Sequence, residues 1–133
     1  MENNFYIYVY LDTSSAKGNY IFNDLKFEYE PFYVGKGSGD RYKQHLRKRR
    51  IRKSDFLYER IQLIRLNGYE PIVIKLFQFN ETTDINALKM EDLVIEKIGR
   101  KDMLLGPLLN RNKGKSNLMC KNKIVYLTIW NPE

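Results

Sequence analysis

Two segments of the chain are apolar and β-branched enough to form strands of a sheet. Residues 5–11, FYIYVYL, have the composition of a central strand, and residues 71–79, PIVIKLFQF, have the same character. Pro31 marks an edge or a break before a shorter strand at 32–34. The glycines that follow predict a flexible turn; they are Gly35, Gly37 and Gly39.

Three other regions outside the predicted helices have sequences typical of strands or loops. Residues 20–35 predict extended structure with a turn at Asn23-Asp24. Residues 100–114 have the composition of a loop with short helical stretches. Residues 124–131, KIVYLTIW, predict a late strand or a tail that docks on the domain.

The middle of the chain predicts two consecutive helices. Asp40 can cap a first helix over residues 41–53, and Ser54 can cap a second helix that Asn67-Gly68 closes. Apolar residues of the second helix recur at helical spacing, so we expect them to point inward; they are Leu57, Ile61 and Ile64.

A third helix starts near the capping residues Thr82, Thr83 and Asp84 and ends at Gly99. One of its faces carries Leu88, Glu91, Ile95 and Ile98. A carboxylate within an apolar stripe is costly unless something pairs with it. Glu91 is therefore either part of an ion pair at the edge of the core or a ligand for a divalent cation in a cleft.

The chain has 133 residues, enough for one domain with its own core. The order of its elements predicts an α+β fold with a small, mostly antiparallel sheet flanked by helices. One cysteine, Cys120, excludes a disulfide framework and a zinc site built from cysteines. No segment has the length and apolarity of a membrane span, and no signal peptide is evident, so we expect an intracellular protein.

The net charge of +7 is concentrated in one block. Residues 41–53 contain eight lysines and arginines and no acidic residue. Such a block is either a solvated helix face or a surface that binds a phosphate backbone. Its position beside the glycines and the only histidine, His45, favours nucleic acid. The residues expected to contact DNA are Lys43, Arg47, Lys48, Arg49, Arg50, Arg52 and Lys53.

Arg41 and His45 are four residues apart, which places them on one face of the first helix. Free backbone N–H groups at a helix start favour an anion, so Arg41 can bind a phosphate while His45 exchanges a proton nearby. The same spacing is also common on ordinary helix surfaces. Tyr6, Tyr8 and Tyr10 alternate and share one face of their strand, where they form a core layer or line a cleft. A tyrosine hydroxyl in a cleft with cations can act as a base.

These elements together resemble the GIY-YIG nuclease family. Tyr8-Val9-Tyr10 stands where that family has its first tripeptide, and Tyr33-Val34-Gly35 is similar to the second. Arg41 and His45 resemble its helix with the catalytic arginine, and residues 90–99 resemble its glutamate helix, with Glu91 in the metal-ligand position.

The resemblance extends over residues 5–114, because residues 106–114 are similar to the segment that supplies an asparagine, which Asn110 fits best among Asn110, Asn112 and Asn117. Residues 1–114 would then form the nuclease domain, and residues 115–133 an extension packed on it. Two features depart from the family. Tyr8 replaces the first glycine, a change that the strand tolerates. The 22 residues between Tyr10 and Tyr33 are about twice the usual number, so residues 13–30 would form an inserted hairpin at the sheet edge.

The resemblance implies a three-stranded antiparallel sheet and a metal-dependent endonuclease that cleaves DNA. Tyr10 would act as general base or orient the attacking water, and Arg41 would stabilise the charge of the transition state. Glu91 would hold one Mg²⁺ or Mn²⁺. Tyr33 would donate or accept a hydrogen bond within the site.

Three further roles are implied. Lys36 would lower the pKa of a catalytic phenol, and His45 would relay a proton. Asn110 would brace the glutamate helix or a water. A concerted double-strand break would require a homodimer, and sequence specificity could come from a separate partner.

Two other functions fit parts of the sequence. A binding module of the same fold would hold nucleic acid without cutting it, but such a module would not need Tyr10, Arg41 and Glu91 together. An RNA-binding accessory of translation would expose aromatic side chains on its sheet as stacking platforms. The face that carries Tyr6, Tyr8 and Tyr10 is the only feature that fits this second alternative.

Overall fold

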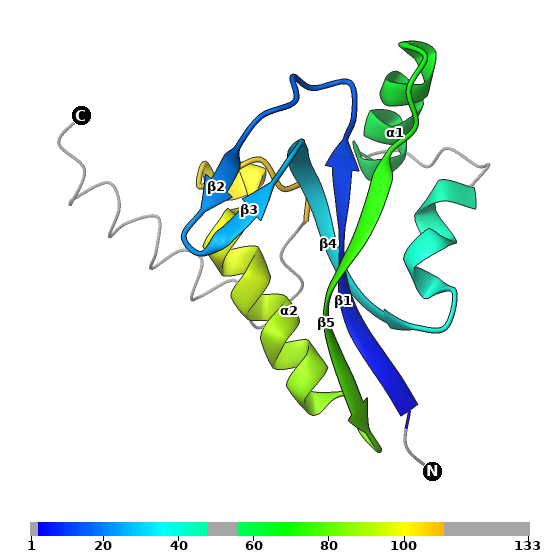
Figure 1. Ribbon diagram of the computed structural model, residues 1–133, viewed down its shortest axis with the longest axis vertical. Coiled ribbons are helices and arrows are strands. Elements are labelled where there is room, and N and C mark those ends of the chain that lie inside the picture. Colours follow the sequence, from blue (N-terminus) through cyan, green and yellow to red (C-terminus); the bar gives the residue numbers. More distant parts are fainter. Residues whose placement is uncertain (1–2, 48–55, 111–133) are drawn as a thin grey trace, which may run out of the picture.

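The computed structural model describes residues 3–47 and 56–110. A three-stranded antiparallel sheet lies at its centre (Figure 1). Strand β1 (Asn3–Asp12) is the middle strand, between the edge strands β4 (Glu30–Ser38) and β5 (Ile72–Glu81). The predicted central strand and the strand predicted at 71–79 are confirmed.

Helices cover both faces of this sheet. Helix α2 (Ile85–Ile98) lies on one face, and α1 (Phe56–Leu66) lies on the other beside the 3-10 helix η1 (Arg41–Arg47) (Figure 1). A second 3-10 helix, η2 (Lys101–Met103), follows α2. The predicted α+β fold is therefore confirmed, whereas the first helix is a 3-10 helix rather than an α-helix.

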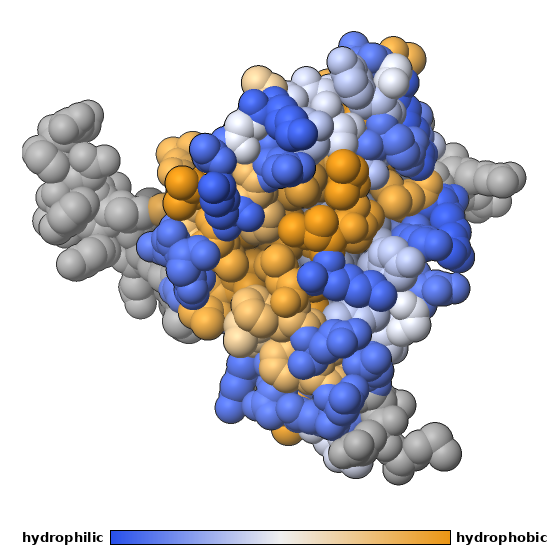
Figure 2. Space-filling model, in the orientation of Figure 1, coloured by the Kyte–Doolittle hydropathy of each residue, from blue (hydrophilic) through white to orange (hydrophobic). Residues whose placement is uncertain are grey.

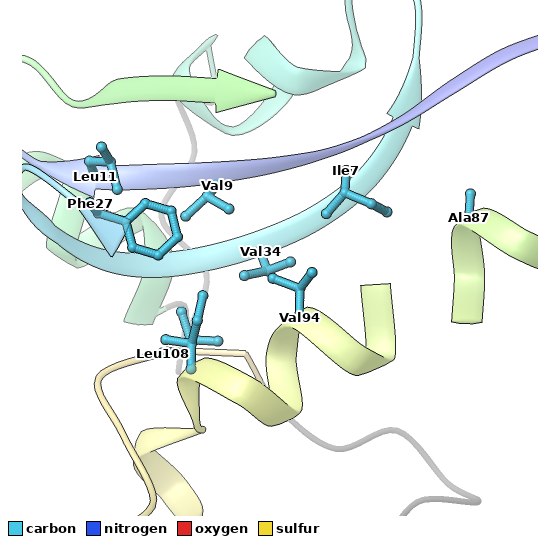
Figure 3. Packing of buried hydrophobic residues seen from close by; sticks show 9 residues of the cluster. Ile7, Val9, Leu11, Phe27, Val34, Ala87, Val94 and Leu108 are labelled. Atoms are coloured by element: carbon cyan, nitrogen blue, oxygen red, sulfur yellow. The ribbon is translucent and has the colours of Figure 1, made fainter. Parts of the chain in front are cut away.

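The middle strand divides the core in two because its side chains alternate across the sheet. Aliphatic side chains on the α2 side form one buried cluster, which Figure 3 shows from close by; it includes Ile7, Val9, Leu11, Val34 and Val94. Aromatic side chains on the α1 side form the other cluster; its buried members from β1 are Tyr6, Tyr8 and Tyr10.

Strand β4 is longer than the sequence predicts. The expected strand at 32–34 continues to Ser38 and includes Gly35 and Gly37, so the predicted flexible turn at these two glycines is wrong. Of the three glycines only Gly39, with φ of 57°, lies in a turn. A glycine inside a strand often marks a place where another group approaches the backbone closely, and tyrosine rings occupy that space here.

The inserted segment forms the predicted hairpin, from β2 (Tyr20–Phe22) and β3 (Leu25–Phe27), with Asn23 in the left-handed region at its turn. It makes a separate two-stranded sheet and adds no strand to the main sheet. Side-chain packing holds it instead, since Phe27 belongs to the α2-side cluster. Its turn is fastened to the end of α2 by an ion pair of 2.8 Å between Lys97 and Asp24.

Helix α2 has its predicted bounds but a different buried face. Its buried residues are Ala87, Val94 and Ile98, whereas Leu88, predicted to be inward, is 43% exposed. The small side chain of Ala87 lets the start of the helix approach the sheet, which turns the buried stripe away from Leu88. Glu91 then lies half-buried at the border of this stripe.

Helix α1 agrees with its prediction, since Leu57, Ile61 and Ile64 are buried and the chain leaves it at Gly68 with φ of 87°. The cap expected at Ser54, the break expected near residue 53 and the strand expected at 124–131 lie outside the described residues. In residues 3–47 and 56–110, no helix combines the length and apolarity that crossing a membrane requires.

Helix α2 covers only part of its face of the sheet. Figure 2 shows hydrophobic surface where α2 and β5 lie side by side. Ile74 and Leu76 of β5 pack against the α2-side cluster but are only half-buried. The β4 side of the sheet, which carries the site described below, is therefore the better-covered side.

An ion-pair network ties the end of β1 to α1. Asp12 is 6% exposed and accepts hydrogen bonds from Nε and Nη2 of Arg60 at 3.0 and 2.8 Å. The same Nη2 also donates to Glu30 at 2.8 Å, and the guanidinium lies over the Phe32 ring. Burial alone would raise the pKa of Asp12, but hydrogen bonds from Ser14 and Arg60 outweigh it and hold this pKa below its usual value.

Asp12→Ala should lower the free energy of unfolding by about 3 kcal/mol at pH 7, because it leaves the guanidinium of Arg60 partly buried without its main partner. Glu30→Ala is the matched control and should cost less than about 1 kcal/mol, since its carboxylate is more exposed. The depressed pKa of Asp12 means that its contribution is complete at pH 7, begins to fall below about pH 4 and is lost as the pH passes through the lowered folded-state pKa. Urea unfolding at pH 7 and pH 3 measures the cost of each substitution and its dependence on pH. Equal losses of unfolding free energy in the two variants would contradict the role of Asp12 as the main partner of Arg60.

Candidate active site

The site is built on the pairing of β1 with β4. Tyr10 lies opposite Tyr33 and Tyr8 lies opposite Gly35, so the two tripeptides face each other in antiparallel register. A bulge follows Tyr10 and leaves Phe32 without an opposite residue. Bulges re-aim side chains, and this one directs both Phe32 and Tyr33 at Tyr10, with ring centroids 5.9 and 5.8 Å away.

Two glycines make room for the tyrosine face of β1. A side chain at Gly35 would collide with the ring and hydroxyl of Tyr8, which lie directly over it. A Cβ at Gly37 would lie 2.8 Å from the Cβ of Arg41 and 3.5 Å from the hydroxyl of Tyr6. The glycines therefore serve close packing rather than backbone mobility.

Hydroxyls of Tyr6 and Tyr10 hold the backbone that leads into η1. The Tyr6 hydroxyl donates to the carbonyl of Gly39 at 2.6 Å and accepts from the N–H of Tyr42 at 3.1 Å. The Tyr10 hydroxyl donates to the carbonyl of Tyr42 at 2.7 Å. From the other side, Arg65 of α1 donates to the carbonyl of Leu46 at 2.9 Å. These bonds position η1 over the tyrosine face.

Helix η1 brings Arg41 and His45 to this face. The His45 ring is half-buried, with its centroid 5.1 Å from Tyr33 and 6.2 Å from Tyr10. Arg41 is exposed, but its charge acts on the phenols of both Tyr8 and Tyr33. Because a 3-10 helix has three residues per turn, the predicted alignment of Arg41 with His45 on one α-helical face is wrong, although both are placed near Tyr33.

Glu91 reaches the same group of side chains from α2. Burial raises the pKa of Tyr33 to about 12, the negative charge of Glu91 adds to the rise, and Arg41 opposes it. Burial is also the main cause of the raised pKa of Tyr8, to which Glu91 again contributes. The carboxylate therefore lies close enough to act on both phenols across β4.

The burial of Tyr10 opposes the formation of the phenolate that its expected role as general base requires. It is the largest cause of the raised pKa of Tyr10, whose side chain is completely buried. Tyr10 thus keeps its proton at neutral pH, and its hydroxyl donates a hydrogen bond to the backbone carbonyl of Tyr42. Tyr33 is only half-buried, and within the described residues its hydroxyl has no hydrogen-bond partner, so it is the phenol that a water or a phosphate can approach.

Lys36 points to the opposite face of β4 from Tyr33. Its ammonium is 2.6 Å from the carboxylate of Asp84, at the start of α2. Asp84 makes no capping hydrogen bond with its side chain, although it occupies the predicted cap position. The charge of Lys36 is therefore directed to α2, and its expected effect on a catalytic phenol stays a prediction.

Asn110 binds the second tripeptide itself. Its Oδ1 accepts from the N–H of Val34 at 2.9 Å, and its Nδ2 donates to the carbonyl of Val34 at 2.7 Å. The N–H of Leu109 donates to the carbonyl of Phe32 at 2.8 Å. The amide thus takes the place of a neighbouring strand along the outer edge of β4. It braces β4 rather than α2. Asn112 and Asn117 lie outside the described residues.

The donor set around Glu91 fits a largely hydrated cation. In residues 3–47 and 56–110, no group of three or more histidine, cysteine or carboxylate side chains could enclose a metal. Mg²⁺ does not need such a group, because it commonly keeps several waters and binds one or two carboxylates plus phosphate oxygens. One half-buried carboxylate, whose charge acts on the phenols of Tyr8 and Tyr33, meets that requirement.

Basic side chains extend from the site along η1. Lys43 and Arg47 are exposed, as the charge pattern predicts, whereas Lys48, Arg49, Arg50, Arg52 and Lys53 lie outside the described residues. Lys75 of β5 was not among the predicted residues; its ammonium lies 4.4 Å from the centroid of the Tyr6 ring and 4.3 Å from that of Tyr42. The feature of the sequence that could have pointed to Lys75 is that it is a single lysine within an apolar strand.

Tyr8, which was expected only to be a tolerated replacement for glycine, has a larger part in the site. The residue lies within the site, between Tyr10 and Tyr33, with ring centroids 5.6 and 6.3 Å away. Tyr6, Tyr8 and Tyr10 are each at most 3% exposed. The stacking platform that the RNA-binding alternative requires is therefore not present on this face, where the rings are buried.

Gly35→Ala should lower the free energy of unfolding by about 1–3 kcal/mol and abolish whatever activity the site has, because the new methyl group would displace the Tyr8 ring. Gly18→Ala is the control, since no atom lies within 4 Å of its added Cβ. Urea unfolding of both variants measures the difference, and equal stabilities would contradict the close packing of Tyr8 on Gly35.

Comparison with known proteins agrees with this geometry. Searches of curated proteins and of solved structures returned no match. A family model described as the LEM-3-like GIY-YIG domain matches residues 5–123, which is most of the chain. The matched range includes both tripeptides, η1 and α2. The chain therefore belongs to the LEM-3-like GIY-YIG family of nuclease domains.

Proposed function

We propose that the protein is a metal-dependent endonuclease that hydrolyses phosphodiester bonds in DNA. The observation that carries this proposal is that the Tyr33 ring adjoins the ring of His45, while the charges of Arg41 and Glu91 both act on its phenol. A phenol, a guanidinium, an imidazole and a carboxylate supply proton transfer, charge stabilisation and metal binding. These are the requirements of phosphodiester hydrolysis.

Arg41 stabilises the transition state. Its guanidinium is exposed at the start of η1, where a phosphate can reach it, and its positive charge already acts on Tyr8 and Tyr33. A guanidinium can donate two parallel hydrogen bonds to a phosphate, and these strengthen as negative charge accumulates on the oxygens.

Tyr33 takes the proton of the attacking water, and His45 accepts it next. Tyr33 suits this role better than Tyr10, because the Tyr10 hydroxyl is occupied by the carbonyl of Tyr42. The His45 ring lies edge-on to the Tyr33 ring and is half-buried, so it can exchange the proton with solvent. Tyr10 then acts as a positioning residue for η1.

Glu91 would hold one Mg²⁺ or Mn²⁺, an ion that needs few protein ligands because it commonly keeps several of its waters. A bound divalent ion stabilises the negative charge of the leaving 3′ oxygen. Glu91 is suited to this role by its half-buried position and by the proximity that its effect on Tyr33 implies.

DNA lies along η1. Lys43 and Arg47 are exposed on this helix, and Lys75 adds a cation from β5 beside Tyr42. Contacts of this kind bind the phosphate backbone without reading its sequence. The basic residues at 48–53 continue the same block in the sequence.

Cleavage should depend on a divalent ion and on Glu91. We expect Mg²⁺ or Mn²⁺ to support nicking of supercoiled plasmid by the wild-type protein, and EDTA to stop it. Glu91→Gln should reduce the rate at least about 100-fold, because metal binding contributes several kcal/mol to the transition state, and should leave DNA binding intact.

The control for this variant is Asp92→Asn, which removes a neighbouring exposed carboxylate of α2 and should cleave at the wild-type rate. Tight, salt-sensitive binding of DNA without cleavage under any condition would instead identify a binding module of the same fold. Equal rates for Glu91→Gln and the wild type would overturn the metal site.

The rate of cleavage should rise with pH. A base must be deprotonated, and below the Tyr33 pKa of about 12 its deprotonated fraction grows tenfold per pH unit. The logarithm of kcat should therefore rise by about one per unit between pH 7 and 9. Tyr33→Phe should lose this slope along with about 100-fold or more in rate, whereas Tyr69→Phe, an exposed control, should keep both. A flat profile in the wild type would exclude Tyr33 as the base.

A further inference from the structure

Tyr8 is the feature of the site that the roles above leave unexplained. It stands where the family has a glycine, and its side chain is 3% exposed. Its ring lies over Gly35 and adjoins the rings of Tyr10 and Tyr33. Filling the space over a glycine explains a ring at this position but not a hydroxyl, because phenylalanine would fill it equally well.

The tyrosine hydroxyls of β1 differ in whether they have a hydrogen-bond partner. Tyr6 and Tyr10 donate to backbone carbonyls around η1. The Tyr8 hydroxyl has no hydrogen-bond partner in residues 3–47 and 56–110, and every fully buried side-chain oxygen of these residues has one. The Tyr8 oxygen must therefore reach the surface, with its capacity to bind still free.

Charges around Tyr8 fit a group that binds a phosphate. Arg41 and Glu91, the proposed phosphate and metal ligands, both act on its phenol. Burial is the main cause that raises the pKa of Tyr8 above that of an ordinary phenol, so the hydroxyl carries its proton at neutral pH. A neutral phenol in this setting is a hydrogen-bond donor rather than a base.

We propose that Tyr8 is a further catalytic residue, whose neutral hydroxyl donates a hydrogen bond to a non-bridging oxygen of the scissile phosphate. This inference rests on the proposed nuclease function. The non-bridging oxygens gain negative charge in the transition state, so a fixed donor stabilises that state more than the bound substrate. Its rigid placement over Gly35 means that the donor needs no reorganisation during the reaction.

Tyr8→Phe tests this role, because it removes the hydroxyl and keeps the ring over Gly35. We expect kcat to fall about 100-fold, the cost of removing one oxyanion donor, while KM and the dissociation constant for plasmid DNA stay within about twofold. The pH slope should be unchanged, in contrast to Tyr33→Phe. Tyr29→Phe is the matched control, since it removes a hydroxyl on the α2 side of the sheet and should cleave at the wild-type rate.

Thermal unfolding of each variant separates catalysis from folding. A loss of kcat with an unchanged midpoint supports the donor role. A rate equal to the wild type overturns it and leaves the nuclease proposal intact, and a fall in the unfolding midpoint together with weaker DNA binding assigns the hydroxyl to structure instead. Absence of cleavage by the wild type would overturn the nuclease proposal and this inference together.

Discussion

The register between β1 and β4 is the constraint on which the rest of the site depends. With Tyr10 opposite Tyr33 and Tyr8 opposite Gly35, the four residues form a single layer on the α1 side of the sheet. A slip of one residue would send every one of these side chains to the other face. The absence of a side chain at Gly35 favours this register, because only a glycine can lie beneath the Tyr8 ring. The bulge after Tyr10 then adds Phe32 to the same face without disturbing the pairs beyond it.

The tyrosine layer carries out two tasks with one residue type. Where a hydroxyl meets a backbone carbonyl, as at Tyr6 and Tyr10, it fixes the start of η1 and with it Arg41 and His45. Where a hydroxyl is left open, as at Tyr8 and Tyr33, it faces the charges of Arg41 and Glu91. A buried hydroxyl without a partner is destabilising, so the open pair can persist only where water or substrate reaches it. The same burial that builds the core thereby leaves open the two hydroxyls to which catalytic roles are proposed.

Much of this could be read from the sequence, because it depends on local signals. Residues 5–11 and 71–79 are strand-like in composition, and Asn67-Gly68 and Gly99 end their helices as such residues commonly do. The errors came from contacts between distant segments. Gly35 was taken for part of a turn because nothing local indicates that Tyr8 covers it. Likewise η1 looked α-helical from its own residues, whereas its backbone is bound by Tyr6 and Tyr10, more than thirty residues away in the chain.

Strand β4 is the element that joins both faces of the sheet into one site. Its inner edge pairs with β1, and its outer edge is closed by the amide of Asn110 on Val34. On the α2 face, the pair of Lys36 with Asp84 ties it to the start of the helix that carries Glu91. On the other face it presents Tyr33 and Gly35. Fixing this one strand from three sides therefore fixes the distance between the proposed metal ligand and the proposed base, which come from opposite sides of the sheet. For this reason, loss of the Asn110 amide would act on the proposed catalysis through the position of Tyr33, because the amide binds the backbone of the adjacent Val34.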